Sequence, residues 1–208
     1  FILMGQSWVN GHLPYTQLWD LKPPITFLYF ALIIKIFGKS FFAIRFFGAV
    51  MVALTSLFTY AIAIKFTTKK VAFWTAIFSV FFQSLFGSLQ GVMSEHICTF
   101  FFVAALYILV HKTDAKWFFT SGLLLGLSVM TKLNMAYPVF CLGLYFLWEG
   151  FYEKHALKNI KNLVFMGAGF FVTIACTAIP YYLQGDTQIW WESIFEAPLA
   201  YSEGRFHS

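Results

Sequence analysis

Charged residues are scarce in this chain. Asp, Glu, Lys and Arg make up 11% of its 208 residues, whereas apolar residues make up 60% and aromatic residues 22%. Soluble domains carry about 25% charged residues, so this chain has too few to cover a surface in water. The deficit excludes a soluble globular protein and predicts an all-α fold, a polytopic bundle of transmembrane helices.

The chain also lacks the patterns that mark several kinds of chemistry. It has no glycine-rich phosphate loop, no HExxH or GxSxG motif, and no Cys or His pair at metal-binding spacing. Its cysteines, Cys98, Cys141 and Cys176, stand singly within apolar runs, so we expect them to be small buried hydrophobic residues. No basic stripe interleaved with exposed aromatics is present, and the net charge of +5 therefore indicates basic loops, not a nucleic-acid partner.

Neither end of the sequence resembles the natural end of a protein. The chain has no initiator Met, no basic stretch and no cleavage site before its first apolar residues, and it stops within a polar segment. We therefore interpret residues 1–208 as a single transmembrane domain that is a fragment. Its first transmembrane helix and its C-terminal part are expected to lie outside this sequence.

Apolar runs and basic clusters together predict a topology. The strongest basic cluster, Lys65, Lys69 and Lys70, belongs in the cytoplasm under the positive-inside rule, with segments 111–116 and 149–162 on the same side. The runs expected to span the membrane are 41–64, 71–89, 97–110, 117–130, 135–148 and 163–183. The polar stretches that then share the outer side are 11–24, 90–96, 131–134 and 184–208.

The apolar run 25–37 is an exception. It is shorter than the roughly 20 residues that a spanning helix needs. It follows Pro23 and Pro24, which suit a first helical turn, and it ends at Gly38. If the preceding loop and Phe41 both lie outside, this segment cannot cross the membrane. We expect it to lie in the outer interface or to dip in and return, so that interfacial helices and loops cover the outer face of the bundle.

The loop 11–24 holds the first candidate residues. Asp20 and Lys22 stand at the edge of an apolar segment, where a charge is costly without a partner or a role. Two interpretations remain open. In the first interpretation, both residues are ordinary interface anchors, with Lys22 snorkelling at a helix start. Alternatively, Lys22 binds an anionic head group as a point charge and Asp20 binds a hydroxyl or a metal.

Other charged residues lie at the same boundary. Glu95 suits a helix N-terminus after a Ser94 cap, but with His96 it forms a pair able to act as a base, a metal-ligand pair or a hydroxyl binder. Lys132 is either a solvated loop lysine or a second cation for a phosphate, and Arg45 is either a snorkelling residue or the partner of an acid. Candidates of lower rank are Gln90, Tyr201, Arg205 and His207.

One long segment resembles a known family. Its features, in order, are Gly11, Pro14-Tyr15, Trp19-Asp20-x-Lys22-Pro23-Pro24, Phe37-Gly38, Phe42-Ala43-x-Arg45, Glu95 before a Phe-rich run, Gly122-x-x-x-Gly126 and Thr131-Lys132. They resemble GT-C-type membrane glycosyltransferases, in the branch of the protein O-mannosyltransferases and the bacterial lipid A aminoarabinose transferases. The resemblance covers roughly residues 5–150.

The resemblance implies an inverting sugar transfer. The donor is expected to be a polyprenyl-phosphate sugar, and the acceptor a hydroxyl or amine of a glycan, lipid or protein. The site is expected on the outer face of the plasma (inner) membrane, towards the periplasm or exterior. A phosphate leaving group needs cations, and an alcohol nucleophile needs a base. The alternatives are a polytopic transporter or flippase of a lipid-linked substrate, and a catalytically inactive family member.

Residue roles follow from the same resemblance. The expected substrate-binding residues are Lys22, Tyr15, Lys132 and Arg205. The expected catalytic residues are Asp20, Glu95 and His96, and the carboxylate that serves as the base is expected upstream of Phe1. Some relatives carry an acid directly before the lysine, where this chain has Leu21. No cofactor is established, and a divalent metal remains open.

Overall fold

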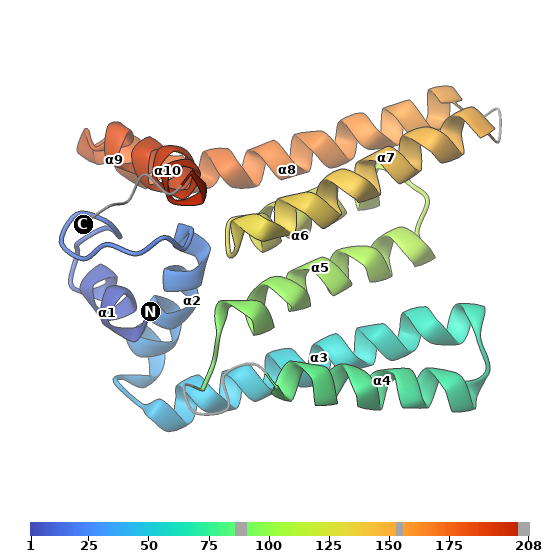
Figure 1. Ribbon diagram of the computed structural model, residues 1–208, viewed down its shortest axis with the longest axis horizontal. Coiled ribbons are helices and arrows are strands. Elements are labelled where there is room, and N and C mark those ends of the chain that lie inside the picture. The colour runs from blue at the N-terminus through green and yellow to red at the C-terminus, as the bar shows by residue number, and fades with distance from the viewer. Residues whose placement is uncertain (86–90, 153–155, 204–208) are drawn as a thin grey trace.

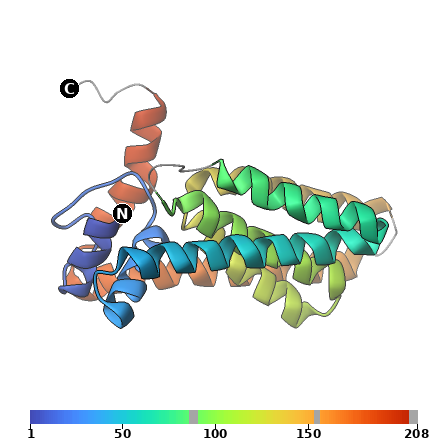
Figure 2. The ribbon, with the colours of Figure 1, turned by 90° about the horizontal axis from the view of Figure 1, so that it is seen from below.

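The computed structural model describes residues 1–85, 91–152 and 156–203. The described chain is helical and contains no strand, which confirms the predicted all-α membrane bundle. Six helices run side by side along the long axis of the molecule (Figures 1 and 2). They are α3 (Phe41–Phe66), α4 (Lys69–Ser84), α5 (Ser94–His111), α6 (Ala115–Val129), α7 (Ala136–Tyr152) and α8 (Ala156–Gln184).

Three of these helices contain stretches long and apolar enough to cross a membrane. The stretches are Phe41–Phe66, Ser94–His111 and Asn159–Gln184. The helix α6 is apolar but shorter, as the predicted span 117–130 already was. Of the predicted span 71–89, the structure describes α4 up to Ser84 and the turn at Leu85, and residues 86–89 lie outside the described part.

The loop predicted at 149–162 is wrong for most of its length. The helix α7 continues to Tyr152 and α8 already begins at Ala156. The prediction took the rise in polarity as the end of a helix. Lysine is nevertheless a good helix former, so Lys161 lies exposed on a helix surface. Polarity marks where the chain leaves the apolar layer, and the helix continues beyond that point.

The helices α6 and α8 pack unusually closely. A Cβ atom added at Gly122 would lie 2.0 Å from the carbonyl oxygen of Met166, and one added at Gly126 would lie 2.6 Å from Cβ of Thr173. The hydroxyl of Thr173 donates to the carbonyl of Leu123 at 3.0 Å. Small residues spaced by four with an interhelical hydrogen bond are typical of membrane helix pairs. This contact fixes the position of α6.

Two shorter helices lie across one end of the bundle. The helices α1 (Ile2–Val9) and α2 (Pro24–Phe37) run transverse to the long helices (Figure 1). They cross at Gly5, where an added Cβ would lie 2.7 Å from Cβ of Phe30. As predicted, Pro24 opens α2 and Gly38, with φ of +68°, closes it. Placement of α2 in the membrane interface stays a prediction.

The C-terminal segment is more ordered than its polar sequence indicated. It forms α9 (Thr187–Trp191), the π-helix η2 (Glu192–Glu196) and α10 (Ala197–Ser202). Trp190 and Ile194 are buried in a cluster with Leu13 and Tyr181. This segment therefore packs against the loop between α1 and α2.

The prediction that all three cysteines are buried is wrong for two of them. Cys98 is buried, but Cys141 and Cys176 are exposed on helix surfaces. An apolar run in a membrane protein has an apolar outer surface as well as an apolar core. A small apolar residue therefore fits either position.

Candidate functional site

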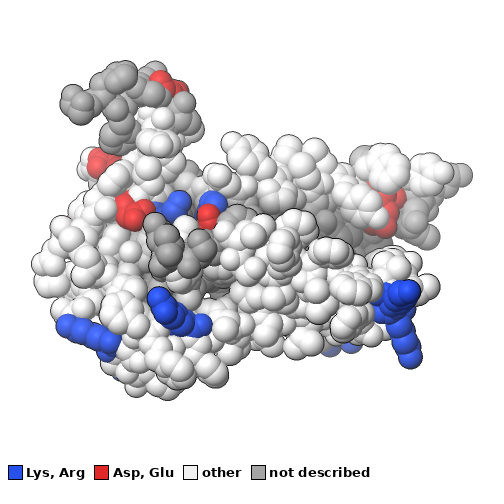
Figure 3. Space-filling model, turned by 60° about the horizontal axis from the view of Figure 1, so that its bottom comes forward, with Lys and Arg blue, Asp and Glu red and all other residues white. Residues whose placement is uncertain are grey.

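The polar segments between the helices meet at one end of the bundle. The loop 10–23, the start of α3, the segment 91–93 before α5 and the turn 130–132 after α6 all lie at the left end in Figure 1. Figure 3 shows acidic and basic side chains grouped beside one another at this end, while most of the surrounding surface is uncharged. The sequence predicted this gathering from topology.

A joint between two helix ends holds this region together. The N–H of Ile25, in the first turn of α2, donates to the carbonyl of Met130 at the end of α6, at 3.1 Å. The hydroxyl of Thr26 donates to the carbonyl of Thr131 at 2.7 Å. The positive end of one helix dipole thus meets the negative end of another, and orphan groups at both ends are satisfied.

The joint places two lysines near each other in the fold. Lys22 lies directly before the Pro-Pro start of α2, and Lys132 lies directly after the hydrogen-bonded Thr131. Both lysines are half-buried. Segments far apart in the sequence therefore bring two predicted phosphate-binding cations to one region.

Side chains of the loop itself hold the backbone around Lys22. The Asp20 carboxylate accepts the Lys22 N–H at 3.0 Å, and the Tyr15 hydroxyl donates to the Lys22 carbonyl at 2.6 Å. Tyr15 has a φ of +70°, which is costly for a bulky residue. The Tyr181 hydroxyl of α8 donates to the Pro14 carbonyl at 3.3 Å. These bonds fix the course of the loop.

Tyr15 lies beneath the loop and not on its surface. Its side chain is buried and stacks on Tyr181, with ring centroids 6.3 Å apart. Burial raises the pKa of Tyr15 well above its ordinary value, and Tyr181 and Asp20 raise this pKa further. The phenol therefore stays protonated and keeps its bond to the Lys22 carbonyl. The structure thus places Tyr15 behind Lys22, and its predicted contact with substrate stays a prediction.

Glu95 and Lys132 form an ion pair across two helix ends. Lys132 Nζ lies 2.7 Å from Glu95 Oε1, and the side chains are 24% and 20% exposed. Ser94 Oγ donates to Glu95 Oε2 at 3.0 Å, so both carboxylate oxygens are occupied. Met93, and not Ser94 as predicted, is the residue at the N-cap of α5. Glu95 thus balances the charge of Lys132.

Both ring nitrogens of His96 are occupied by backbone groups. Nδ1 accepts the N–H of Met93 at 3.0 Å, and Nε2 lies 3.0 Å from the carbonyl oxygen of Gln83. Because an N–H only donates and a carbonyl only accepts, this geometry requires the neutral Nε2–H tautomer. His96 thus joins the end of α4 to the start of α5, with both ring nitrogens already bonded to backbone groups, and its predicted catalytic role stays a prediction.

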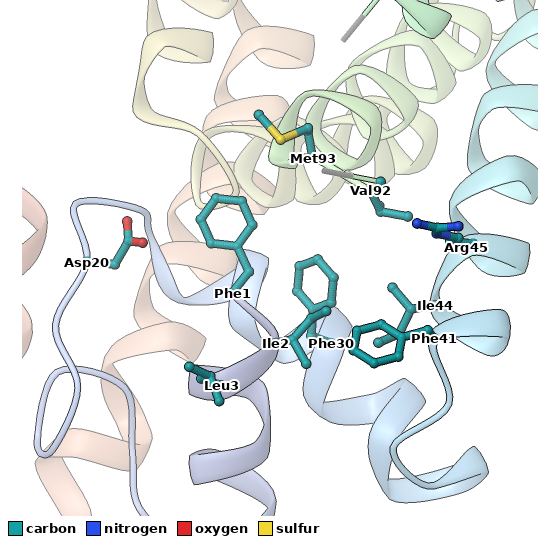
Figure 4. Close-up of a pocket in the computed structure, with 11 residues that line it drawn as sticks. Phe1, Ile2, Leu3, Asp20, Phe30, Phe41, Ile44, Arg45, Val92 and Met93 are labelled. Carbon is teal, nitrogen blue, oxygen red and sulfur yellow. The ribbon is translucent and has the colours of Figure 1, made fainter. Parts of the chain in front are cut away.

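A cavity of about 510 Å³ opens at this end. Asp20 and Arg45 lie on its opposite sides, with apolar side chains between them (Figure 4). No carboxylate of the described residues lies within ion-pair distance of Arg45. The remaining lining residues are Phe1, Ile2, Leu3, Phe30, Phe41, Ile44, Gly91, Val92 and Met93.

A second cavity of about 180 Å³ adjoins the first at Arg45. It shares Gly91 and Val92 with the larger cavity and continues along α3 past Gly48 and Val52. Arg45 therefore stands between a wide cavity that carries a carboxylate and a narrow one whose walls along α3 are small and apolar. The sequence left the role of Arg45 undecided, because a linear pattern does not show that Arg45 has no acidic partner among the described residues.

The predicted site residues thus separate into groups. Asp20 lines the large cavity, Lys22 lies two residues further along the same loop, and Glu95 is paired with Lys132. Within the described residues, no group of three His, Cys, Asp or Glu side chains comes together to hold a metal ion. The lower-ranked Tyr201 is exposed on α10, and Gln90, Arg205 and His207 lie outside the described part of the chain.

Comparison with known proteins gives one match. No curated protein and no solved structure matches the chain. The profile of the dolichyl-phosphate-mannose-protein mannosyltransferase family matches residues 21–179. This range includes Lys22, Arg45, Glu95 and Lys132, and begins one residue after Asp20. The match covers well over half of the sequence, and the chain therefore belongs to the dolichyl-phosphate-mannose-protein mannosyltransferase family of GT-C glycosyltransferases.

Proposed function

We propose that the cavity between Asp20 and Arg45 binds the head of a polyprenyl-phosphate sugar. The protein then transfers this sugar, with inversion, to a hydroxyl or amine of a glycan, lipid or protein on the outer face of the plasma membrane. The observation that carries the proposal is the cavity itself, in which a guanidinium without an acidic partner among the described residues faces a carboxylate across apolar walls.

Arg45 and Lys22 are the proposed phosphate-binding residues. A guanidinium binds a phosphate through two parallel hydrogen bonds, and Arg45 has no ion-pair partner in the described structure that would compete. Lys22 adds a point charge from the adjoining loop. Lys132 is already neutralised by Glu95 at 2.7 Å, so we assign this pair to holding the turn in place.

The lipid part of the donor has a separate path. A polyprenyl chain attached to a phosphate at Arg45 needs an apolar channel that starts there. The narrow cavity along α3 starts at Arg45. Gly48, Ala49 and Val52 form its wall along α3, and His96 is a polar residue in its lining. The sugar would then occupy the wide cavity, towards Asp20.

The transfer itself needs a base for the acceptor. The acceptor oxygen or nitrogen attacks the anomeric carbon, the bond from that carbon to the phosphate oxygen breaks, and its electron pair leaves with the phosphate. The proton of the acceptor passes to a carboxylate. Asp20 is the carboxylate in the cavity wall, and it positions the sugar or acceptor. A base upstream of Phe1 stays an expectation, and Phe1 itself lines the cavity.

Donor kinetics in the full-length protein test this proposal. The assay follows a radiolabelled polyprenyl-phosphate sugar in membranes containing Arg45→Gln, Arg45→Lys or the control Lys39→Gln. Losing one preorganised charge at a developing anion costs about 100-fold, so we expect a loss of this size in kcat/KM for Arg45→Gln and a smaller one for Arg45→Lys. Lys39 is exposed and does not line the cavity, so Lys39→Gln should retain full transfer. Equal transfer by all variants would remove Arg45 from the site.

A further inference from the structure

A third cavity lies between the two transverse helices, apart from the site described above. Its volume is about 210 Å³. It is lined by Trp8 and Val9 of α1 and by Leu28, Ala31, Leu32 and Lys35 of α2. We call it the α1–α2 groove. Pockets that hold whole drug-sized ligands are about 300–1,000 Å³, so this groove fits a segment of chain and not a complete ligand.

The groove and the Arg45 cavity lie on opposite sides of the helix crossing. Along α1, Ile2 and Leu3 line the Arg45 cavity, whereas Trp8 and Val9 line the groove. Gly5, where α1 meets α2, lies between these pairs. The groove therefore has its own opening, separate from the proposed donor site.

The surface around the groove is apolar and exposed. Leu32 is 51% exposed, and Ile36 and Phe37 in the last turn of α2 are 70% and 51% exposed. Helices that lie across the end of a membrane bundle, with large apolar side chains outward, are typical of the membrane interface. Trp8 in the groove wall has the amphipathic ring that settles at headgroup level.

The charge at the groove has one sign. Among the described residues that line it, Lys35 is the only charged one. Lys39 follows directly after the end of α2, and the sequence contains no Asp or Glu from residue 21 to residue 94. An exposed ammonium on a long aliphatic stem beside apolar surface suits an anionic lipid headgroup. A zwitterionic headgroup gains less from this cation.

We propose that the α1–α2 groove binds an acidic phospholipid of the surrounding bilayer. One acyl chain lies in the groove against Trp8 and Leu28, and the headgroup phosphate contacts Lys35. The site is distinct from the donor site and does not depend on the proposed function, since it shares no lining residue with the Arg45 cavity.

Native mass spectrometry of the full-length protein tests the site. The protein is released from detergent with phosphatidylglycerol or phosphatidylcholine of identical acyl chains, and retained lipid adducts are counted. We expect about fivefold preference for phosphatidylglycerol, the factor expected for one basic residue near an anionic lipid. Lys35→Gln should abolish most of this preference.

Lys39→Gln is the matched control, because it removes the same charge from an exposed residue outside the groove lining. It should keep the preference of the wild type. Equal losses in both variants would indicate general surface attraction and overturn the proposal, as would equal retention of the two lipids by the wild type. Displacement of phosphatidylglycerol by added polyprenyl phosphate would also overturn it, by assigning the groove to the donor. Unchanged helicity of both variants by circular dichroism confirms that they fold.

Discussion

The two ends of the bundle carry charge in different ways. At the end with the loops, Asp20, Lys22, Glu95 and Lys132 are all half-buried. Glu95 and Lys132 pair with each other and join the start of α5 to the end of α6, while the Asp20 carboxylate accepts the N–H of Lys22 within its own loop. Charges held in this way have restricted positions and incomplete solvation, which a binding site requires.

At the opposite end, basic residues lie at the turns α3–α4 and α5–α6 and are exposed. Lys65 donates to the carbonyl of Val110, and Lys112 lies 5.6 Å from the ring centroid of the nearby Trp117. These lysines lie at helix ends, and the positive-inside rule predicts that this end faces the cytoplasm. The comparison shows that the number of charges does not distinguish the two ends, whereas half-burial of charged side chains and their place in a cavity wall do.

The largest expected difference between the ends is their sidedness. Cysteine introduced by Lys39→Cys should react with an impermeant maleimide added to intact cells, and Lys69→Cys only after permeabilisation. The background variant has Cys98, Cys141 and Cys176 replaced by alanine, because two of these are exposed. Gel-shift labelling measures the outcome, and labelling of both positions from one side would refute the topology.

Removing one lysine from each end compares their roles in catalysis. Lys22→Ala should lower transfer by about 100-fold, since a phosphate leaving group loses a positioned cation. Lys69→Ala should leave transfer unchanged, because Lys69 is exposed at the far end. Initial rates with a labelled donor measure this, with insertion checked by expression level in the membrane. A Lys22→Ala protein with wild-type rates would contradict the phosphate role.

The ion pair at the loop end should behave as one unit. Glu95→Gln leaves Lys132 half-buried without its partner. We therefore expect a fall in kcat/KM larger than the factor that corresponds to ~1 kcal/mol, the free energy lost with a helix cap. Lys132→Gln should act similarly, and the double variant should be little worse than either single variant. A double-mutant cycle of kcat/KM measures the coupling. Strictly additive effects would show that the two residues act separately.

The smallest effect is expected from the hydroxyl behind Lys22. Tyr15→Phe keeps the buried ring but removes the hydrogen bond to the Lys22 carbonyl. This loss should lower kcat/KM by the factor that corresponds to about 1 kcal/mol. Tyr182→Phe is the control, because Tyr182 is 74% exposed beside the buried Tyr181. Donor KM separates the two outcomes: a positioning role raises KM, whereas a purely structural role lowers thermal stability alone.

Much of the fold followed from the sequence because its signals are local. The apolar runs predicted the long helices, and Pro24 and Gly38 predicted both ends of α2, since each residue acts through its own backbone. The first part of α8, before Leu163, and the folded segment after Gln184 were missed. Their polar residues resemble a loop, and only packing partners such as Trp190 against the loop cluster show otherwise.

The site was predicted as a region, but not as an arrangement of side chains. Topology placed Asp20, Lys22, Glu95 and Lys132 at one end, and the family resemblance gave them roles. Whether a lysine is free or paired depends on distances between helices, which spacing does not encode. The structure shows Lys132 paired with Glu95, and we therefore assign the main phosphate-binding role to Arg45. It also shows backbone partners for Tyr15 and His96 that no sequence pattern predicts.

The joint between α2 and α6 has a consequence for biosynthesis. The Thr26–Thr131 bond spans 105 residues and the Tyr181–Pro14 bond spans 167 residues. Lys22 and its local partners Asp20 and Tyr15 are thus made early, but Thr131 and Tyr181, which anchor the loop to α6 and α8, leave the ribosome much later. Contacts of such long range form late and slowly. The loop that carries Lys22 is therefore among the last parts of the described domain to reach its final position, long after Lys22 itself has been synthesised.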